Sequence, residues 1–357
     1  MSKEIVVQKN RFISLDLLRG VAAIGVIFYH AMPHSRVTDP LQCLVDFFFV
    51  LSGFVLEPIY PRSYKDFNNT KRFLSKRVLR FWPMVTCAIT VRLIRTSLIG
   101  HNVQYGSNNI VLAYLLLQIF SADAVRVLVP LWSLSAEWVV NVSSVPFIAM
   151  RKYWHILCFV LFGYLMIFVY LKNYDPNSIV NRNYVVLPIS GFGGLGRAIV
   201  GFGIGLAIRM IHNGYQKKSE TSFGNTLLII ACAVLLLVVI MNRFDNYVLL
   251  VAPLCFAPIV YLVANFNFMR ADTFWYRFAV LMGNLSFGIY VWHLVFVNPF
   301  GGHKLSASPI IEGVIEFSVM LTLAVIATRL TQKYVERPIQ GYFKRRQMSA
   351  TLPESSR

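Results

Sequence analysis

The chain has 357 residues, of which 56% are hydrophobic and only 14% are charged. An average soluble domain has about 25% charged residues, so this composition argues against two or three soluble domains and favours one bundle in lipid. The formal net charge of +18 raises nucleic-acid binding as a function. The basic residues, however, fall between apolar runs and form no single patch, so we expect no nucleic-acid partner.

Ten apolar stretches have the length, roughly 17–25 residues, that a helix needs to cross a bilayer. They cover residues 12–31, 44–60, 81–99, 130–150, 154–171, 188–210, 224–241, 247–265, 278–298 and 310–328. An eleventh stretch, 110–120, is too short to span, and it predicts a re-entrant or interfacial helix.

The basic residues also predict the orientation of these stretches. With the N-terminus in the cytoplasm, the cytoplasmic segments hold most of the Lys and Arg residues between spans, and the outer loops hold few, as the positive-inside rule requires. We therefore predict an all-α polytopic membrane bundle of about ten helices, surrounded by membrane lipid, with both termini cytoplasmic. Residues 1–346 form one transmembrane domain in this prediction, and residues 347–357 form a disordered tail.

Neither a cleaved leader nor cysteine chemistry is expected. Asp16 and Arg19 interrupt the first apolar stretch, which therefore differs from a signal peptide and is expected to stay in the protein. The five cysteines form no C-x-x-C pair and all but Cys43 lie inside apolar runs. They are typical of small core residues and predict neither a disulfide framework nor a metal site.

Charged residues inside the apolar stretches are the strongest functional signal, because such residues are costly in a membrane. Arg19 and His30 lie eleven residues apart, so they share one helix face at an axial separation of about 16 Å. An arginine there suits a phosphate or carboxylate ligand, and a histidine suits proton transfer. The alternatives are a structural ion pair between Arg19 and Asp16, and a His30 that is merely hydrogen-bonded at the helix end.

Glu137 lies in the middle of its apolar stretch, just after Ser133 and Ser135. A purely structural glutamate at that depth is the less favoured interpretation. Paired with His30, the carboxylate could orient the imidazole and stabilise its charged form while the histidine deprotonates an acceptor hydroxyl. Sequence alone leaves open whether the two side chains meet.

Six motifs in order resemble the acyltransferase-3 family of integral membrane acyltransferases. They are Leu15-Asp16-Leu17-Leu18-Arg19-Gly20 followed by the R-x10-H spacing to His30, Val45-Asp46-Phe47-Phe48-Phe49-Val50-Leu51-Ser52-Gly53-Phe54, Arg77-Val78-Leu79-Arg80-Phe81-Trp82-Pro83, Trp132-Ser133-Leu134-Ser135-Ala136-Glu137-Trp138, Ser286-Phe287-Gly288-Ile289-Tyr290-Val291-Trp292-His293, and Val335-Glu336-Arg337-Pro338. Each motif alone is weak, but the ordered set covers residues 15 to 338.

The resemblance implies transfer of an acyl group, usually acetyl from acetyl-CoA, to a hydroxyl of an acceptor at the cytoplasmic (inner) membrane. The acceptor in such proteins is commonly a carbohydrate or lipid-linked glycan of a surface polysaccharide, and sometimes a small, antibiotic-like molecule. It implies no metal. The residues it marks are His30, Glu137 and Asp46 as catalytic, Arg19, Arg77 and Arg80 as acyl-CoA-binding, and Ser52, Trp132, Ser133, Ser135, Tyr290 and His293 as supporting.

A proton-coupled transporter would also explain buried charges, and it remains the alternative. Transporters commonly show internal repeats with broken helices in corresponding halves. The glycine-rich stretch from 191 to 205 has no clear counterpart in the first half of the sequence. These glycines are more typical of close helix packing, so the sequence favours the enzyme.

Overall fold

The computed structural model describes residues 11–35, 37–59, 67–98, 105–145, 152–172, 188–215, 248–265, 273–297, 306 and 308–349. Every regular element in these ranges is helical, which confirms the predicted all-α class. The α-helices are α1 (Ile13–Ala31), α2 (Leu44–Leu56), α3 (Phe67–Leu98), α4 (Ser107–Tyr114), α5 (Ala122–Val127), α6 (Leu131–Ser143), α8 (Tyr153–Lys172), α9 (Pro188–Tyr215), α11 (Val248–Asn265), α12 (Phe274–Trp292), α13 (Pro309–Thr331) and α14 (Arg337–Ser349).

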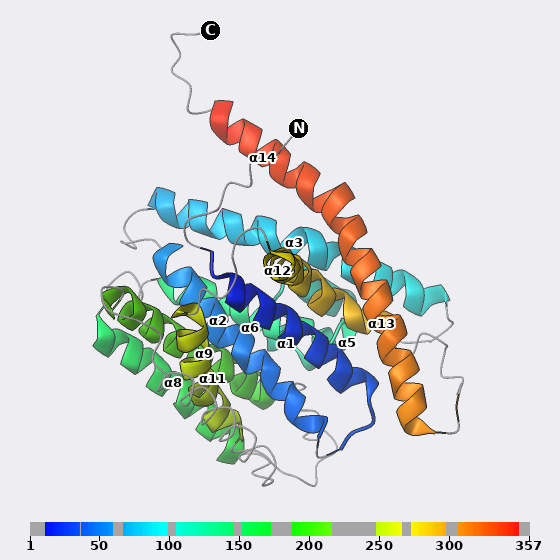
Figure 1. Ribbon diagram of the computed structural model, residues 1–357, viewed down its shortest axis with the longest axis horizontal. Helices are drawn as coiled ribbons and strands as arrows, with labels where there is room; N and C mark the ends of the chain where they lie inside the picture. Colours follow the sequence, from blue (N-terminus) through cyan, green and yellow to red (C-terminus); the bar gives the residue numbers. More distant parts are fainter. Residues whose placement is uncertain are drawn as a thin grey trace.

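Short turns of tighter or wider helix connect some of these elements. The 3₁₀ turns are η1 (Asp39–Cys43), η2 (Glu57–Ile59), η3 (Gln118–Phe120) and η4 (His293–Phe296). A π-helical turn, η5 (Gln332–Glu336), joins α13 to α14, and α14 extends this line beyond the rest of the bundle (Figure 1).

Six helical stretches in the described residues are long and apolar enough to cross a membrane: Ile13–Ala31, Asp39–Leu56, Tyr153–Lys172, Gly193–Asn213, Phe274–Phe296 and Pro309–Phe343. The apolar part of α11, Leu250–Asn265, is shorter. The chain is therefore a multi-pass membrane protein by length and composition. The total of ten spans and the cytoplasmic termini stay predictions, and the predicted span 224–241 lies outside the described residues.

The outer surface of α8 is apolar, as expected of a helix that faces lipid. Leu157, Leu161, Phe162, Leu165 and Phe168 are each more than half exposed. In water this surface would be a large exposed apolar patch, whereas hydrocarbon solvates it without cost.

The bounds of α3 and α14 are among those that differ from the sequence-based prediction. Residues 61–80 connect the predicted spans 44–60 and 81–99, yet α3 already begins at Phe67 within this connection and runs for 32 residues. Lysine, arginine and leucine are good helix formers, so the helix continues past the apolar stretch into its charged flank. The last helix ends at Ser349, three residues into the tail that was predicted from residue 347.

The short stretch 110–120 forms α4 and the turn η3, separated by Leu116, which has a positive φ of 54°. Its eight-residue helix is far below the length that spans a bilayer. The stretch is not among the six candidate spans, and its re-entrant or interfacial role stays a prediction.

Three helix pairs make the closest contacts: α8 with α9, α2 with α9, and α1 with α12. In Figure 1, α8, α9 and α11 lie together on one side of α2, and α12 and α13 lie on the far side of α1. Gly53 of α2 shows why the second pair is so close, because a Cβ built on it would overlap the carbonyl oxygen of Phe202 in α9. Only glycine permits this approach.

The helices α1 and α12 run in the same direction. Gly20 lies against Met282, and ten residues further along α1 the ring of His30 lies against that of His293, just past the end of α12. The motif residues of α1 and those of α12 therefore lie along one helix–helix contact.

Candidate active site

An inner cavity of about 90 Å³ lies between α1, α2, α3, α6 and α12. Its walls are largely apolar and include four phenylalanine rings. The polar side chains that line it are Arg19, Ser52, Arg77, Arg80, Ser133, Glu137, Ser286 and Tyr290. Seven of these eight are residues that the sequence marked as catalytic, donor-binding or supporting, although they come from five separate helices.

A larger vestibule of about 500 Å³ adjoins the inner cavity. Both share Arg19, Arg80, Leu51, Val55 and Phe287 in their walls, so the two spaces meet at this boundary. The remaining polar lining of the vestibule is mixed in charge and consists of Arg11, Asp16, Asn284, Gln332, Glu336 and Gln340. It lies where α1 begins and where α13 passes into α14.

The carboxylate of Glu137 is bound by two donors in the inner cavity. The Ser52 hydroxyl donates to Oε1 over 2.6 Å, and Arg77 Nη2 donates to the same oxygen over 2.5 Å. The Arg77 side chain is only 7% exposed, and its guanidinium also lies over the Phe81 ring at 4.5 Å. An ion pair with this little exposure depends on its hydrogen bonds to offset the loss of water.

Arg19 is held at the boundary of the two cavities by α12. Its Nε donates to the Ser286 hydroxyl over 2.8 Å, and its Nη2 donates to the carbonyl oxygen of Gly283. Asp16 lies 3.4 Å from the same Nη2 and also pairs with Arg11. The ion-pair alternative for Arg19 is thus realised, yet the guanidinium still lines both cavities.

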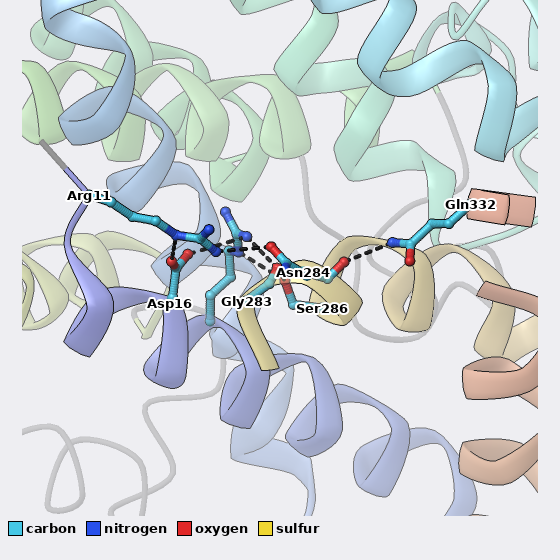
Figure 2. Close-up of polar contacts among 7 residues, drawn as sticks. Arg11, Asp16, Gly283, Asn284, Ser286 and Gln332 are labelled. Carbon is cyan, nitrogen blue, oxygen red and sulfur yellow. Dashed lines mark hydrogen bonds and ion pairs between the residues drawn. The ribbon is translucent and has the colours of Figure 1, made fainter. Parts of the chain in front are cut away.

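Gly283 is required for this arrangement. A Cβ at this position would lie 2.6 Å from the Asp16 Cβ and carboxylate, which is closer than real side chains approach. The neighbouring Asn284 extends the network, because its side chain accepts from Arg11 and its carbonyl accepts from Gln332 (Figure 2).

Tyr290 lies at the other end of the inner cavity. Its hydroxyl donates to the Pro130 carbonyl over 3.2 Å and shares a 2.8 Å hydrogen bond with Ser133. Its ring packs edge-on against Phe48, with centroids 5.6 Å apart. Together Phe48 and Tyr290 form an aromatic wall on that side.

His30 and His293 lie beyond this wall. The Tyr290 and His293 ring centroids are 5.7 Å apart, and those of His293 and His30 are 5.2 Å apart. His293 is fully buried and His30 is partly buried. Glu137 is therefore hydrogen-bonded by Arg77 and Ser52. His30 contacts the ring of His293 and not Glu137.

Asp46 lines neither cavity. Its carboxylate accepts two hydrogen bonds from Arg197 of α9, over 3.0 and 2.7 Å, and is fully buried. Trp132 packs on this pair, with the Arg197 guanidinium 5.4 Å from its ring centroid. Asp46 and Trp132 therefore belong to the α2–α6–α9 contact next to the cavity.

Ser135 supports the short stretch that precedes α5. Its hydroxyl accepts from the backbone N–H of Ile119 over 3.1 Å, and the side chain is fully buried. Like Asp46 and Trp132, Ser135 packs next to the inner cavity and does not line it.

Arg197 and Ser286 were given no role by the sequence-based assignment. Arg197 carried a usable signal, because a charge in an apolar stretch requires an opposite partner, and Asp46 is another such charge. Ser286 was visible as part of a motif, but nothing in that motif indicates that its hydroxyl holds Arg19. Among the described residues, no cluster of three or more His, Cys, Asp or Glu side chains is arranged to hold a metal ion.

Comparisons with known proteins show the family of the chain. A family model described as an acyltransferase domain matches residues 12–329. The curated protein "Protein 2 in picA locus" of Rhizobium radiobacter is 37% identical over 84 residues, which are 23% of this chain and 44% of that protein. The chain thus matches less than half of the length of this relative, and no solved structure matches it. Because the family model covers most of the chain, including the residues of the inner cavity and the histidine pair, the chain belongs to the acyltransferase-3 family.

Proposed function

We propose that this protein transfers an acetyl group from acetyl-CoA on the cytoplasmic side to a hydroxyl group of an acceptor, a sugar of a surface or exported polysaccharide. The single observation that carries the proposal is that the vestibule and the inner cavity meet at Arg19 and Arg80. An anionic donor with a long flexible arm suits such a pair of spaces.

The vestibule suits the nucleotide end of acyl-CoA. Arg80 is exposed in the cavity walls and makes no hydrogen bond or ion pair to another described residue. Its planar guanidinium is therefore available to a phosphate, which it can bind through two parallel hydrogen bonds. Arg19 lies beside it, fixed by Ser286 and Gly283.

The inner cavity suits the thioester end. Its walls are formed by Phe48, Phe49, Phe81 and Phe287, which favour an apolar acyl group and exclude water. A volume of about 90 Å³ favours a short acyl chain. The Arg77–Glu137 pair supplies a fixed dipole beside this space.

His30 is the general base in this proposal. It takes the proton of the acceptor hydroxyl, the oxygen attacks the acyl carbonyl carbon, and the bond from that carbon to sulfur breaks. The CoA thiolate leaves and takes the proton from the imidazolium, so His30 returns to its neutral form. The thioester, with its sulfur still attached, must reach past the wall of Phe48 and Tyr290 so that it meets both His30 and an acceptor that arrives from the outer side.

The acceptor class rests on the motif resemblance, and a small, antibiotic-like acceptor is compatible with the same site. The predicted cytoplasmic N-terminus puts the vestibule on the side where acyl-CoA is made, and the His30 end on the opposite side. This arrangement supports an acceptor that is exported or exposed at the surface.

Labelled acetyl-CoA and the purified protein in vesicles test the proposal. The acceptor source is the envelope fraction of cells that lack the gene. We expect label to move into polysaccharide with the wild-type protein and not with His30→Ala or Glu137→Ala, at equal amounts of inserted protein. Solute uptake without any transfer of label would favour the transporter and overturn the enzyme.

A further inference from the structure

The contact between His30, the proposed base, and His293 was not predicted from the sequence. His30 lies near the end of α1, and His293 opens η4 directly after α12. Their ring centroids are 5.2 Å apart with the planes inclined by 32°. The structure holds no direct hydrogen bond between the two rings, but at this separation a bridging water or a rotation of the His30 ring would supply one.

The hydrogen bond on the other side of His293 fixes which of its nitrogens carries the hydrogen. Nδ1 lies 2.7 Å from the carbonyl oxygen of Tyr290. A carbonyl oxygen can only accept, so Nδ1 is the N–H and Nε2 of the neutral ring has a bare lone pair. Second-side bonds of this kind commonly set the tautomer of a functional histidine.

The Nε2 atom of His293 is buried and has no hydrogen-bond partner within the described part of the chain. A buried acceptor without a donor costs free energy, and such orphaned atoms are uncommon in folded proteins. His30 is the neighbouring ring that can supply a donor. His34 lies a few residues after His30, but its side chain is mostly exposed and is bound to Asp39 over 2.7 Å.

We infer that His293 is a positioning residue that accepts an N–H from His30 through its bare Nε2. This inference rests on the proposed role of His30 as the base. The hydrogen bond keeps one His30 nitrogen protonated toward His293 and leaves the other one bare toward the acceptor hydroxyl. While the His30 imidazolium holds the proton from the acyl acceptor, it donates a hydrogen bond to the neutral Nε2 of His293. The sequence analysis had given this stabilising task to Glu137.

The proton balance of the step is simple. The acceptor hydroxyl gives its proton to the bare nitrogen of His30, whose second N–H keeps donating to His293. When the carbon–sulfur bond breaks, the same proton passes from His30 to the leaving thiolate. His293 gains and loses no proton, so its side chain can be replaced by any group that accepts a hydrogen bond at the Nε2 position.

Two substitutions separate this role from packing. His293→Gln carries an amide oxygen that can reach the Nε2 position, whereas His293→Leu fills the space without an acceptor. We expect His293→Leu to lower kcat by about 100-fold or more with little change in KM for acetyl-CoA, and His293→Gln to recover most of the loss.

His34→Leu is the matched control at an exposed histidine, and we expect wild-type rates. Wild-type kcat for His293→Leu, or equal losses for the two His293 variants, would overturn the inference.

A tautomer measurement tests the pair without any activity. In protein with ¹⁵N-labelled histidine in nanodiscs, we expect His293 to carry hydrogen on Nδ1 only, and the His30 signal to change in His293→Leu. Hydrogen on Nε2 of His293 would overturn the inference. If the wild-type protein fails to transfer acyl groups, the proposed function fails, and the tautomer spectrum still decides the histidine pair.

Discussion

The Arg77 guanidinium donates to the Glu137 carboxylate over 2.5 Å, although one residue belongs to α3 and the other to α6. The contact lies in the wall of a cavity that α1, α2 and α12 complete. Each residue alone would be an uncompensated buried charge. Together they form the polar centre of a cavity whose walls include four phenylalanine rings.

Replacing Glu137 by Gln tests that centre. The amide oxygen can still accept from Ser52, but the charge that holds Arg77 is lost. Breaking one partner of a buried charge pair costs about 2–5 kcal/mol, so we expect acyl transfer to fall by about 100-fold. Transfer is measured with labelled acetyl-CoA at equal amounts of protein in the membrane.

The matched control is Glu312→Gln, another carboxylate on an apolar helix that lines neither cavity. We expect it to keep wild-type transfer. If Glu137→Gln were as active as this control, the Arg77–Glu137 contact would have no part in the reaction.

Arg80 should act on donor binding. Because its guanidinium lines the vestibule and is free of ion pairs among the described residues, we expect Arg80→Ala to remove the proposed phosphate contact and to leave the fold intact. We expect KM for acetyl-CoA to rise about 10-fold, the effect of one charge-assisted hydrogen bond, with kcat nearly unchanged. Steady-state kinetics of Lys76→Ala, an exposed residue of the same helix, gives the comparison, and an equal rise there would refute a specific role.

The Asp46–Arg197 pair predicts a loss of stability that a second substitution repairs. Asp46→Asn leaves Arg197 as an uncompensated buried cation, which costs about 3–5 kcal/mol. The double variant Asp46→Asn with Arg197→Gln removes both charges and should recover much of that loss. Thermal unfolding of the detergent-purified proteins measures both effects.

Activity of the double variant decides the role of Asp46. If Asp46 only holds α2 against α9, transfer per folded molecule should return with stability. A stable but inactive double variant would show that the carboxylate itself takes part in the chemistry, as the motif resemblance implies.

Close packing of α2 on α9 predicts a sharp difference between two glycines. Gly53→Ala drives a methyl group into the Phe202 carbonyl, whereas a Cβ at Gly341 meets nothing within 4 Å. We expect Gly53→Ala to abolish or strongly reduce folded protein in the membrane. Gly341→Ala should be neutral or stabilise its helix by up to about 1 kcal/mol. Fluorescence-detected gel filtration of both variants provides the measurement, and equal yields would contradict the close contact.

Part of the polar lining of the inner cavity could be predicted from the sequence. Arg19, Ser52 and Glu137 lie in apolar stretches, where a polar side chain must find partners inside the bundle, and the motif resemblance marks all three. All three line the inner cavity. The helical class followed from length and apolar pattern alone.

The choice of partners could not be predicted. Position along a helix gives the depth of a side chain, but the rotation and tilt of each helix decide which neighbour it meets. Glu137 was therefore paired with His30 as a hypothesis, whereas its donors are Ser52 and Arg77. The Asp46–Arg197 contact joins residues 151 positions apart, and nothing local in either segment indicates it.

The most direct test of the central claim is mass spectrometry of surface glycans from cells in which the gene is deleted and then restored. We predict acetylated sugars after restoration with the wild-type gene and none with His30→Ala, at equal levels of membrane-inserted protein. Full acetylation by the His30→Ala protein would contradict the proposed acyl transfer at His30.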